Sequence, residues 1–158
     1  MTGEPVCLDS NYLVALFDQR DVWHQEAARV HEVLRERRVL TITPDCVIDE
    51  VLTALGRRCR ERGQADAFPQ LTDRLLGAVP PEAVTWLYPH VPRWFGRCVA
   101  VMRETAGALD FHDAMLGVAA DELGYRAVVS FDAGFDLLAN LTRLDSAAAA
   151  RAWLTPAT

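Results

Sequence analysis

The chain has 158 residues, of which 51% are hydrophobic, and this length and composition fit one globular domain with a substantial apolar core. A net charge of -6 argues against a protein that coats nucleic acid non-specifically, and no apolar run approaches the ~20 residues of a membrane-spanning helix. All 16 basic residues are arginine, which excludes Walker A phosphate binding and Schiff-base catalysis because both need lysine. Since the N-terminus also lacks a signal-like segment, we expect a cytoplasmic protein without a membrane partner.

The N-terminal half alternates short apolar runs with amphipathic stretches, as strands and helices do when they alternate. In chain order we expect a strand over residues 5–8, a short helix over 10–17, a longer helix from Asp21 to about residue 38, a strand over 39–42, and a helix from Thr43 to about Arg60. Asp9 directly follows the first strand, and Trp23 opens the apolar stripe of the longer helix. Thr43 and Pro44 give the start signal of the last of these helices.

The C-terminal half continues the alternation. In chain order we expect a helix over residues 65–76, a strand over 83–87, a helix over 89–105, a helix from Asp110 to about Gly124, a strand over 127–131, a short strand over 141–143 and an Ala-rich tail helix. Asp110 can cap a helix that has Asp113 at its third position, and Asp132 follows the strand before it. Gly117 and Gly124 share a face with Asp113, and such a face lets the helix lie close to another backbone.

Strands separated by helices throughout predict βαβ units with right-handed crossovers. The predicted fold class is therefore α/β, a three-layer αβα sandwich with a mainly parallel central sheet. We expect a single domain over residues 1–158, with a core over about 4–144 and a helical tail over about 145–158.

Four carboxylates have positions that a shared site would explain: Asp9, Glu50, Asp113 and Asp132. Ligands of open α/β sheets bind beyond the carboxyl ends of the strands, where Asp9 and Asp132 stand. If the four converge, their mutual repulsion requires a cation, and oxygen-only ligands select Mg²⁺ or Mn²⁺. Such a site suits phosphoryl chemistry without a protein nucleophile. Taken singly, each acid also fits a structural role as a turn former, a residue of a helix first turn or an exposed helix residue.

At this point the sequence resembles a known family, the PIN domain, and within it the VapC-type ribonuclease toxins. The resemblance lies in four segments: Val6–Leu13 (VCLDSNYL), Val47–Val51 (VIDEV), Asp113–Ala120 (DAMLGVAA) and Val128–Phe135 (VVSFDAGF). These are similar to the opening strand with its Asp, the helical Glu, the D-A-x-x-x-A-x-A helix and the T-x-D-x-x-F ending of the family. Ser130 stands where the family often has Thr, and Asp110 where Ser, Thr or Pro is commoner.

The resemblance implies a PIN-like fold and an endoribonuclease in which Asp9, Glu50, Asp113 and Asp132 bind Mg²⁺, with Mn²⁺ as a possible substitute. It also implies that RNA is the substrate, that a cognate antitoxin is the inhibitor, and that a homodimer is the usual assembly.

Several further residues are assigned around these acids. We expect Ser130 and Asn11 to support them, Asp110 either to assist the metal or simply to cap its helix, and Asp136 to be a candidate for a second metal. His112 is expected to point in a different direction from Asp113 on the same helix and to serve a surface or packing role, the alternative being a general base.

The strongest basic segment follows the helix of Glu50. It contains Arg57, Arg58, Arg60 and Arg62, which are candidates for contacts with RNA phosphates or with an antitoxin, the alternative being a solvated helix end. Trp86 and Trp94 are candidates for base stacking, although packing explains them equally simply.

Three functions stay open at this stage. The first is the Mg²⁺- or Mn²⁺-dependent endoribonuclease of a toxin–antitoxin pair. The second is a catalytically silent PIN-like module that binds or regulates a partner. The third is a metal-dependent nuclease that acts on another nucleic acid.

Overall fold

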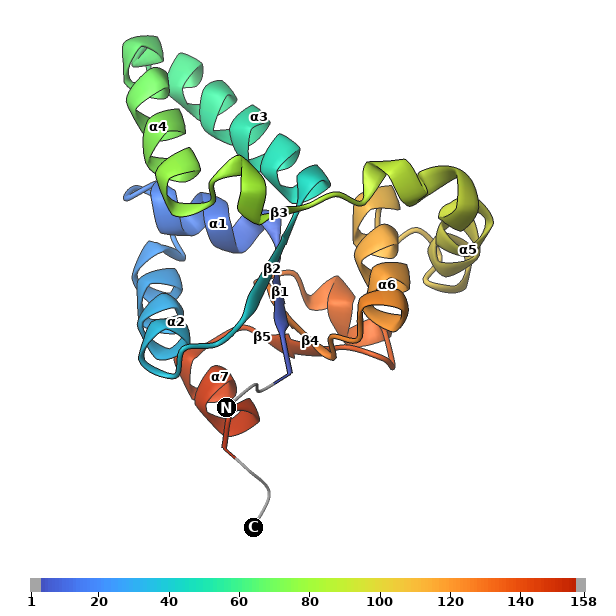
Figure 1. Ribbon diagram of the computed structural model, residues 1–158. Helices are drawn as coiled ribbons and strands as arrows, with labels where there is room; N and C mark the ends of the chain where they lie inside the picture. The colour runs from blue at the N-terminus through green and yellow to red at the C-terminus, as the bar shows by residue number, and fades with distance from the viewer. Residues whose placement is uncertain (1–3, 156–158) are drawn as a thin grey trace.

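The computed structural model describes residues 4–155, and its centre is a sheet of five strands (Figure 1). The strands are β1 (Val6–Leu8), β2 (Thr41–Pro44), β3 (Val84–Thr85), β4 (Ala127–Val129) and β5 (Thr142–Leu144). Their order across the sheet is β3-β2-β1-β4-β5, and each neighbouring pair is parallel. The first strand therefore lies beside the fourth, which brings together, at the middle of the sheet, two segments that are far apart in the sequence.

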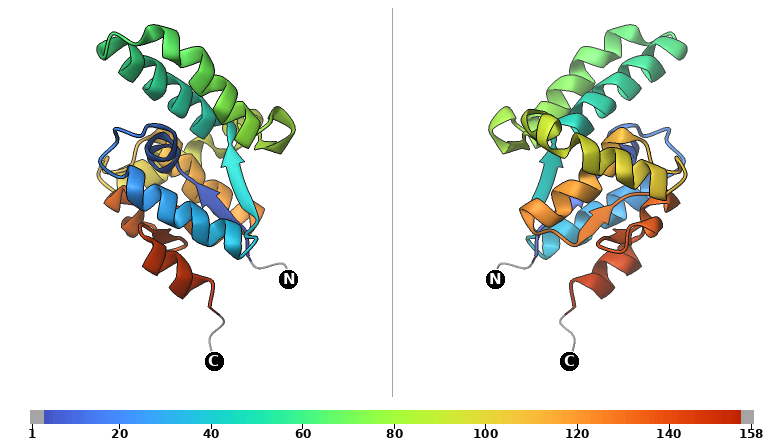
Figure 2. Two further views of the ribbon diagram at one scale, coloured as in Figure 1. Left: turned by 90° about the vertical axis from the view of Figure 1, so that its left-hand side faces the viewer. Right: turned by 90° about the vertical axis from the view of Figure 1, so that its right-hand side faces the viewer.

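Helices cover both faces of this sheet. They are α1 (Ser10–Phe17), α2 (His24–Glu36), α3 (Asp45–Glu61), α4 (Phe68–Ala78), α5 (Val91–Glu104), α6 (Phe111–Leu123) and α7 (Ala147–Trp153), with short 3-10 turns η1 (Ala65–Ala67), η2 (Pro81–Ala83), η3 (Tyr88–His90) and η4 (Ala133–Leu137). The pair α1 and α2 lies on one face and the pair α5 and α6 on the other, while α3 and α4 project together beyond the sheet (Figures 1 and 2). The predicted three-layer α/β architecture with a parallel central sheet is confirmed.

Two predicted helix starts are wrong. Thr43 and Pro44 belong to β2, because they pair with β3, and α3 begins only at Asp45. The carboxylate of Asp45 then accepts hydrogen bonds from the backbone N–H groups of Leu87 (2.9 Å) and Tyr88 (3.0 Å), which fixes the segment after β3. Similarly, α2 begins at His24 rather than at Asp21, because the Asp21 carboxylate accepts from the Trp23 N–H in a turn.

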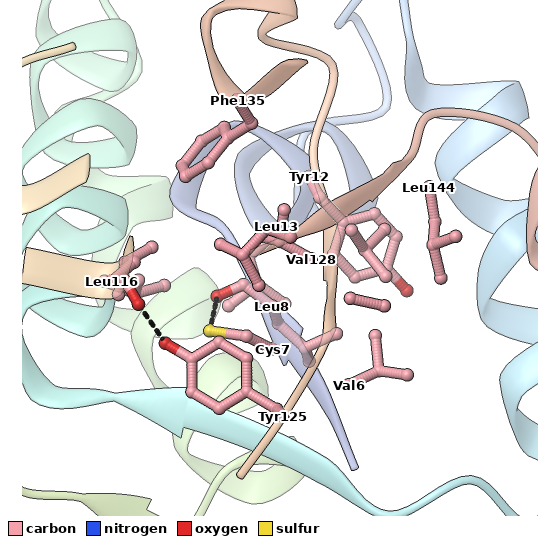
Figure 3. Packing of buried hydrophobic residues seen from close by; sticks show 14 of the residues in the cluster. Val6, Cys7, Leu8, Tyr12, Leu13, Leu116, Tyr125, Val128, Phe135 and Leu144 are labelled. Carbon is pink, nitrogen blue, oxygen red and sulfur yellow. Dashed lines mark hydrogen bonds between the residues drawn. The ribbon is translucent and has the colours of Figure 1, made fainter. Parts of the chain in front are cut away.

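The core is built around β1 and β4, whose residues are buried throughout (Figure 3). Tyr125 lies beneath them and donates its hydroxyl hydrogen to the carbonyl oxygen of Leu116, which pairs a buried phenol with a backbone acceptor. At Gly117 the small-residue face of α6 leaves room for a side chain, that of Leu138. A Cβ atom on Gly117 would meet the side chain of Leu138 at 2.8 Å, and Gly124 is the left-handed residue that ends the helix.

Candidate active site

Asp9 is the most buried of the four predicted acids. It follows β1 and caps α1, and one carboxylate oxygen, Oδ1, accepts the N–H of Ser10 at 2.7 Å. The other oxygen, Oδ2, accepts the hydroxyl hydrogen of Ser130 at 2.7 Å. Only 3% of Asp9 is exposed, so the fold holds this carboxylate in one orientation.

Ser130 links the ends of β1 and β4. Besides donating to Asp9, its hydroxyl oxygen accepts from the side-chain amide of Asn11 (3.1 Å) and from the backbone N–H of Asp132 (3.0 Å). The carbonyl oxygen of the Asn11 side chain in turn accepts the N–H of Phe131 at 3.0 Å. The two residues assigned as supports thus lie between Asp9 and Asp132 and fix the backbone that carries both.

Asp113 lies in the first turn of α6 and forms a reciprocal cap with Asp110. Asp110 Oδ1 accepts the N–H of Asp113 at 2.9 Å, and Asp113 Oδ2 accepts the N–H of Asp110 at 3.2 Å. Of the two roles considered for Asp110, the structure shows the capping role directly.

Glu50 comes from α3 and contacts His112 of α6. Its Oε1 atom lies 2.6 Å from Nδ1 of His112, so His112 contacts another of the four acids, which its direction relative to Asp113 did not predict. Burial is the largest single influence on Glu50 and opposes its ionisation, but hydrogen bonds from His112 and Ser10, together with the charge of His112, outweigh burial and lower the pKa of Glu50 below its usual value. The same hydrogen bond raises the pKa of His112, which favours an imidazolium beside a carboxylate.

Asp132 follows β4 and caps the turn η4. Its Oδ1 atom accepts the N–H of Gly134 at 2.7 Å. A Cβ atom on Gly134 would lie 2.9 Å from Leu109 and 3.1 Å from the Asp132 carboxylate, so only glycine fits this position without displacing a neighbour.

The carboxylates influence one another electrostatically. Burial raises the pKa of Asp9 to about 7. The hydrogen bonds from Ser130 and Ser10 oppose this rise, and the nearby charges of Glu50 and Asp132 add a smaller increase. Burial, then repulsion from Asp9 and Asp110, raises the pKa of Asp113 to about 8. Both values are far above the ordinary range of an aspartate, which is typical of acids crowded at a functional site.

The predicted convergence is incomplete in one respect. Within residues 4–155, no three His, Cys, Asp or Glu side chains lie close enough together to hold one metal ion. The donor chemistry nevertheless fits a hard divalent cation, because the four groups are carboxylates and a cation would offset both the burial that raises the pKa values of Asp9 and Asp113 and the smaller repulsion from their neighbours. The acids share an electrostatic environment without forming a closed cage.

Three other predicted site residues take part in ion pairs elsewhere. Arg143 binds Asp136 through two nitrogens, at 2.9 and 2.8 Å, and lowers its pKa, which argues against a second metal there. Arg58 contacts Asp18 at 2.8 Å and Asp21 at 2.6 Å, and Arg62 contacts Asp18 at 2.8 Å. These two arginines therefore tie α3 to the loop between α1 and α2.

The other two arginines of the basic segment, Arg57 and Arg60, are exposed. Arg57 lies 3.9 Å from Glu61 on its own helix, with more than half of both side chains exposed, and Arg60 is exposed as well. Contact with an external anion therefore remains a prediction for Arg57 and Arg60.

A cleft of about 680 Å³ adjoins the acidic residues. Glu50 and Asp132 line it, together with Asn11, Arg57 and two aromatic residues, Trp23 and Phe131. The rings of Trp23 and Phe131 stack, with centroids 4.9 Å apart and planes 9° apart. The sequence did not reveal this stack, because Trp23 fitted the apolar stripe of the predicted helix, whereas α2 begins only at His24, the residue after Trp23.

Comparison with known proteins finds similarity in structure but not in sequence. No protein-family model and no curated protein matches the sequence. The fold is similar to the crystal structure of the Mycobacterium tuberculosis toxin VapC20, which is described as a sarcin-ricin loop cleaving toxin. The TM-score is 0.61 at 19% sequence identity, over 84% of this chain and 92% of that one. Separately, none of the helices described here is both long and apolar enough to cross a bilayer.

Proposed function

We propose that this protein is a divalent-metal-dependent endoribonuclease of the VapC type and acts as the toxin of a toxin–antitoxin pair. The observation that carries the proposal is the link between β1 and β4, where one hydroxyl, that of Ser130, holds Asp9 and the backbone of Asp132. This arrangement stands beside Asp113 and Glu50 in a fold shared with a toxin that cleaves RNA.

Asp9, Glu50, Asp113 and Asp132 would hold Mg²⁺, or Mn²⁺ in its place. A bound divalent cation supplies Lewis-acid stabilisation of the charge that develops on a phosphodiester. The chain itself supplies orientation: Ser130 and the Ser10 N–H hold Asp9, His112 holds Glu50, and the Gly134 N–H holds Asp132.

The proposal extends to assembly and partners. We place the protein in the cytoplasm as a homodimer that a cognate antitoxin inhibits, with RNA as substrate. Arg57 and Arg60 are the arginines of the basic segment that we assign to RNA or antitoxin contact. Asp110 is assigned to helix capping, and Asp136 to its pair with Arg143.

The test is cleavage of RNA by the purified protein in Mg²⁺ and in EDTA. Asp9→Asn and Asp113→Asn should each lower the rate by more than about a hundredfold while the protein stays folded, because ligand loss exceeds the 10–100-fold effect of outer partners. Asp121→Asn is the matched control, since Asp121 lies on the same helix as Asp113 but pairs with Arg97 and Arg126 at the surface. Cleavage that EDTA leaves intact would refute the metal requirement.

A catalytically silent module is the second candidate, and the open arrangement of the carboxylates is the observation that favours it. Calorimetric titration separates the two, because the nuclease should bind Mg²⁺ at millimolar concentration and the silent module should not. A nuclease for DNA would share the site and would be revealed by cleaving a DNA strand in preference to RNA of the same sequence.

A further inference from the structure

An exposed aromatic stack lines the cleft beside the acidic residues. Trp23 has 49% of its surface exposed although its ring lies flat against Phe131. It contributes little to the core, since the buried residues of α2 begin at Ala27. A large indole held in a fixed orientation at a cleft is the kind of exposed apolar surface that marks a binding site.

The stack has a fixed position relative to the proposed catalytic groups. Phe131 lies between Ser130 and Asp132 in the sequence, and its N–H is held by the Asn11 side chain. Phe131 also packs at a tilt against the buried ring of Tyr12, with centroids 6.5 Å apart. A group lying on Trp23 would therefore stand close to Asp132, at the same end of β4.

The charges of the cleft identify what the stack can bind. Its walls carry the carboxylates of Asp21, Asp49, Glu50 and Asp132 but the guanidinium groups of only Arg57 and Arg58. Arg58 is already paired with Asp18 and Asp21. Contacts with phosphates would therefore supply little of the affinity for an RNA strand, whereas stacking on an aromatic ring attracts the bases and is independent of their charge.

We propose that Trp23, backed by Phe131, is a stacking platform for an unpaired nucleobase of the RNA strand that enters this cleft. The platform rests on the proposed nuclease function and adds to it a base subsite next to the carboxylates. Because every base has an aromatic face, the platform positions a single strand without reading its sequence. It also requires the target to be unpaired at that nucleotide, since a base in a duplex is already stacked on both faces.

The experiment compares ring variants for binding to a fluorescent oligouridylate in Mg²⁺, on an Asp113→Asn background that keeps the RNA intact. Trp23→Ala should raise the dissociation constant about tenfold, and Trp23→Phe should recover most of the affinity. Phe95→Ala is the matched control, because Phe95 is 56% exposed and packs against another aromatic ring, that of Phe111, but does not line the cleft, and it should bind as the parent does.

A second probe separates stacking from other roles of the ring. An abasic oligomer of the same length keeps every phosphate and lacks the bases. The parent should therefore bind it weakly, and Trp23→Ala should bind it with the same affinity as the parent. The salt dependence of oligouridylate binding should be the same for Trp23→Ala and the parent, because stacking releases no counterions, whereas Arg57→Ala should reduce its slope by about one.

Two outcomes would overturn the platform: equal oligouridylate affinity for Trp23→Ala and Phe95→Ala, or an equal loss of affinity for the abasic oligomer in Trp23→Ala. Trp23→Leu keeps the apolar volume, so it replaces Trp23→Ala if circular dichroism shows that the alanine variant unfolds. Cleavage by the unmodified protein together with unchanged binding by the variants would refute the platform alone. A protein that binds RNA through Trp23 but never cleaves it would refute the nuclease instead.

Discussion

Oε1 of Glu50 lies 2.6 Å from Nδ1 of His112, although 62 residues separate the two in the chain. The contact joins α3 to α6, so the helix that projects from the sheet is attached to the helix that carries Asp113. Removing the imidazole in His112→Ala should free the Glu50 carboxylate and lower RNA cleavage about tenfold, the usual effect of losing a partner that orients a ligand. His31→Ala, an exposed histidine on α2, should cleave at the parent rate. A parental rate in His112→Ala would remove any role for this contact.

Ser130 should be replaceable only by another hydroxyl. Ser130→Ala leaves the buried Oδ2 atom of Asp9 and the N–H of Asp132 without their common partner, so cleavage should fall about tenfold. Ser130→Thr keeps the hydroxyl and should retain most of the activity if the added methyl group fits. Initial rates in Mg²⁺, measured beside thermal melts of each variant, distinguish lost orientation from lost folding. Full activity in Ser130→Ala would contradict the prediction.

Gly134→Ala should displace Asp132. The new Cβ atom would lie 3.1 Å from the Asp132 carboxylate and 2.9 Å from Leu109, so one of them must move. We expect cleavage to fall about tenfold, as for other changes that misplace a ligand. Gly96→Ala is the control, because no atom lies within 4 Å of its added Cβ, and in the middle of α5 it should raise stability by up to about 1 kcal/mol.

The metal-free protein should lose stability as the pH rises. The pKa of Asp9 is about 7 and that of Asp113 about 8 in the folded protein, whereas both are 3.8 in an unfolded chain. The folded protein therefore holds protons that the unfolded chain releases, and their stabilising contribution is complete below pH 3.8 and is lost as the pH rises through about 8. Melting curves in EDTA at pH 5 and pH 8 test this, with Asp113→Asn expected to show a smaller difference. Mg²⁺ should raise the melting temperature more at pH 8 than at pH 5, because protons compete with the cation.

The ion pairs of Arg58 should stabilise the fold rather than bind RNA. The side chains of Asp18 and Asp21 are only 6% and 9% exposed. Arg58→Ala leaves Asp21 without its partner and Asp18 with Arg62 alone, so it should lower the unfolding free energy by about 3 kcal/mol. Arg60→Ala, on the same helix but exposed, should change it by less than about 0.5 kcal/mol. Denaturant titration measures both variants. A larger effect of Arg58→Ala on RNA affinity than on stability would reverse the assignment.

The sequence predicted correctly those features that depend on residues close together in the chain. The apolar runs that end at Asp9 and Asp132, and the cap formed by Asp110 and Asp113, were predicted because a strand, a turn and a first helical turn each leave their mark within a few residues. The start of α3 was misplaced because pairing with β3, more than 40 residues later, keeps Thr43 and Pro44 extended against their local preference.

The contacts that sequence analysis missed join distant segments. A helical wheel gives the direction of His112 relative to Asp113 but not the position of α3, so the contact with Glu50 could not be foreseen. The charge of Arg58 and Arg62 was visible, but the acids that neutralise them lie 37 to 44 residues earlier in the chain. The side of the sheet on which each helix packs is a property of the whole chain.

The adjacency of β1 and β4 also affects the protein while it is being made. Asp9 and Glu50 emerge from the ribosome early, but the strand that completes the pocket ends at Val129, and Asp132 follows it. A nascent polypeptide that stops before this point lacks Asp132, one of the four acids, and Phe131, one wall of the cleft, and its other three acids have no β4 beside them. Translation must therefore pass residue 132 before the proposed site can assemble.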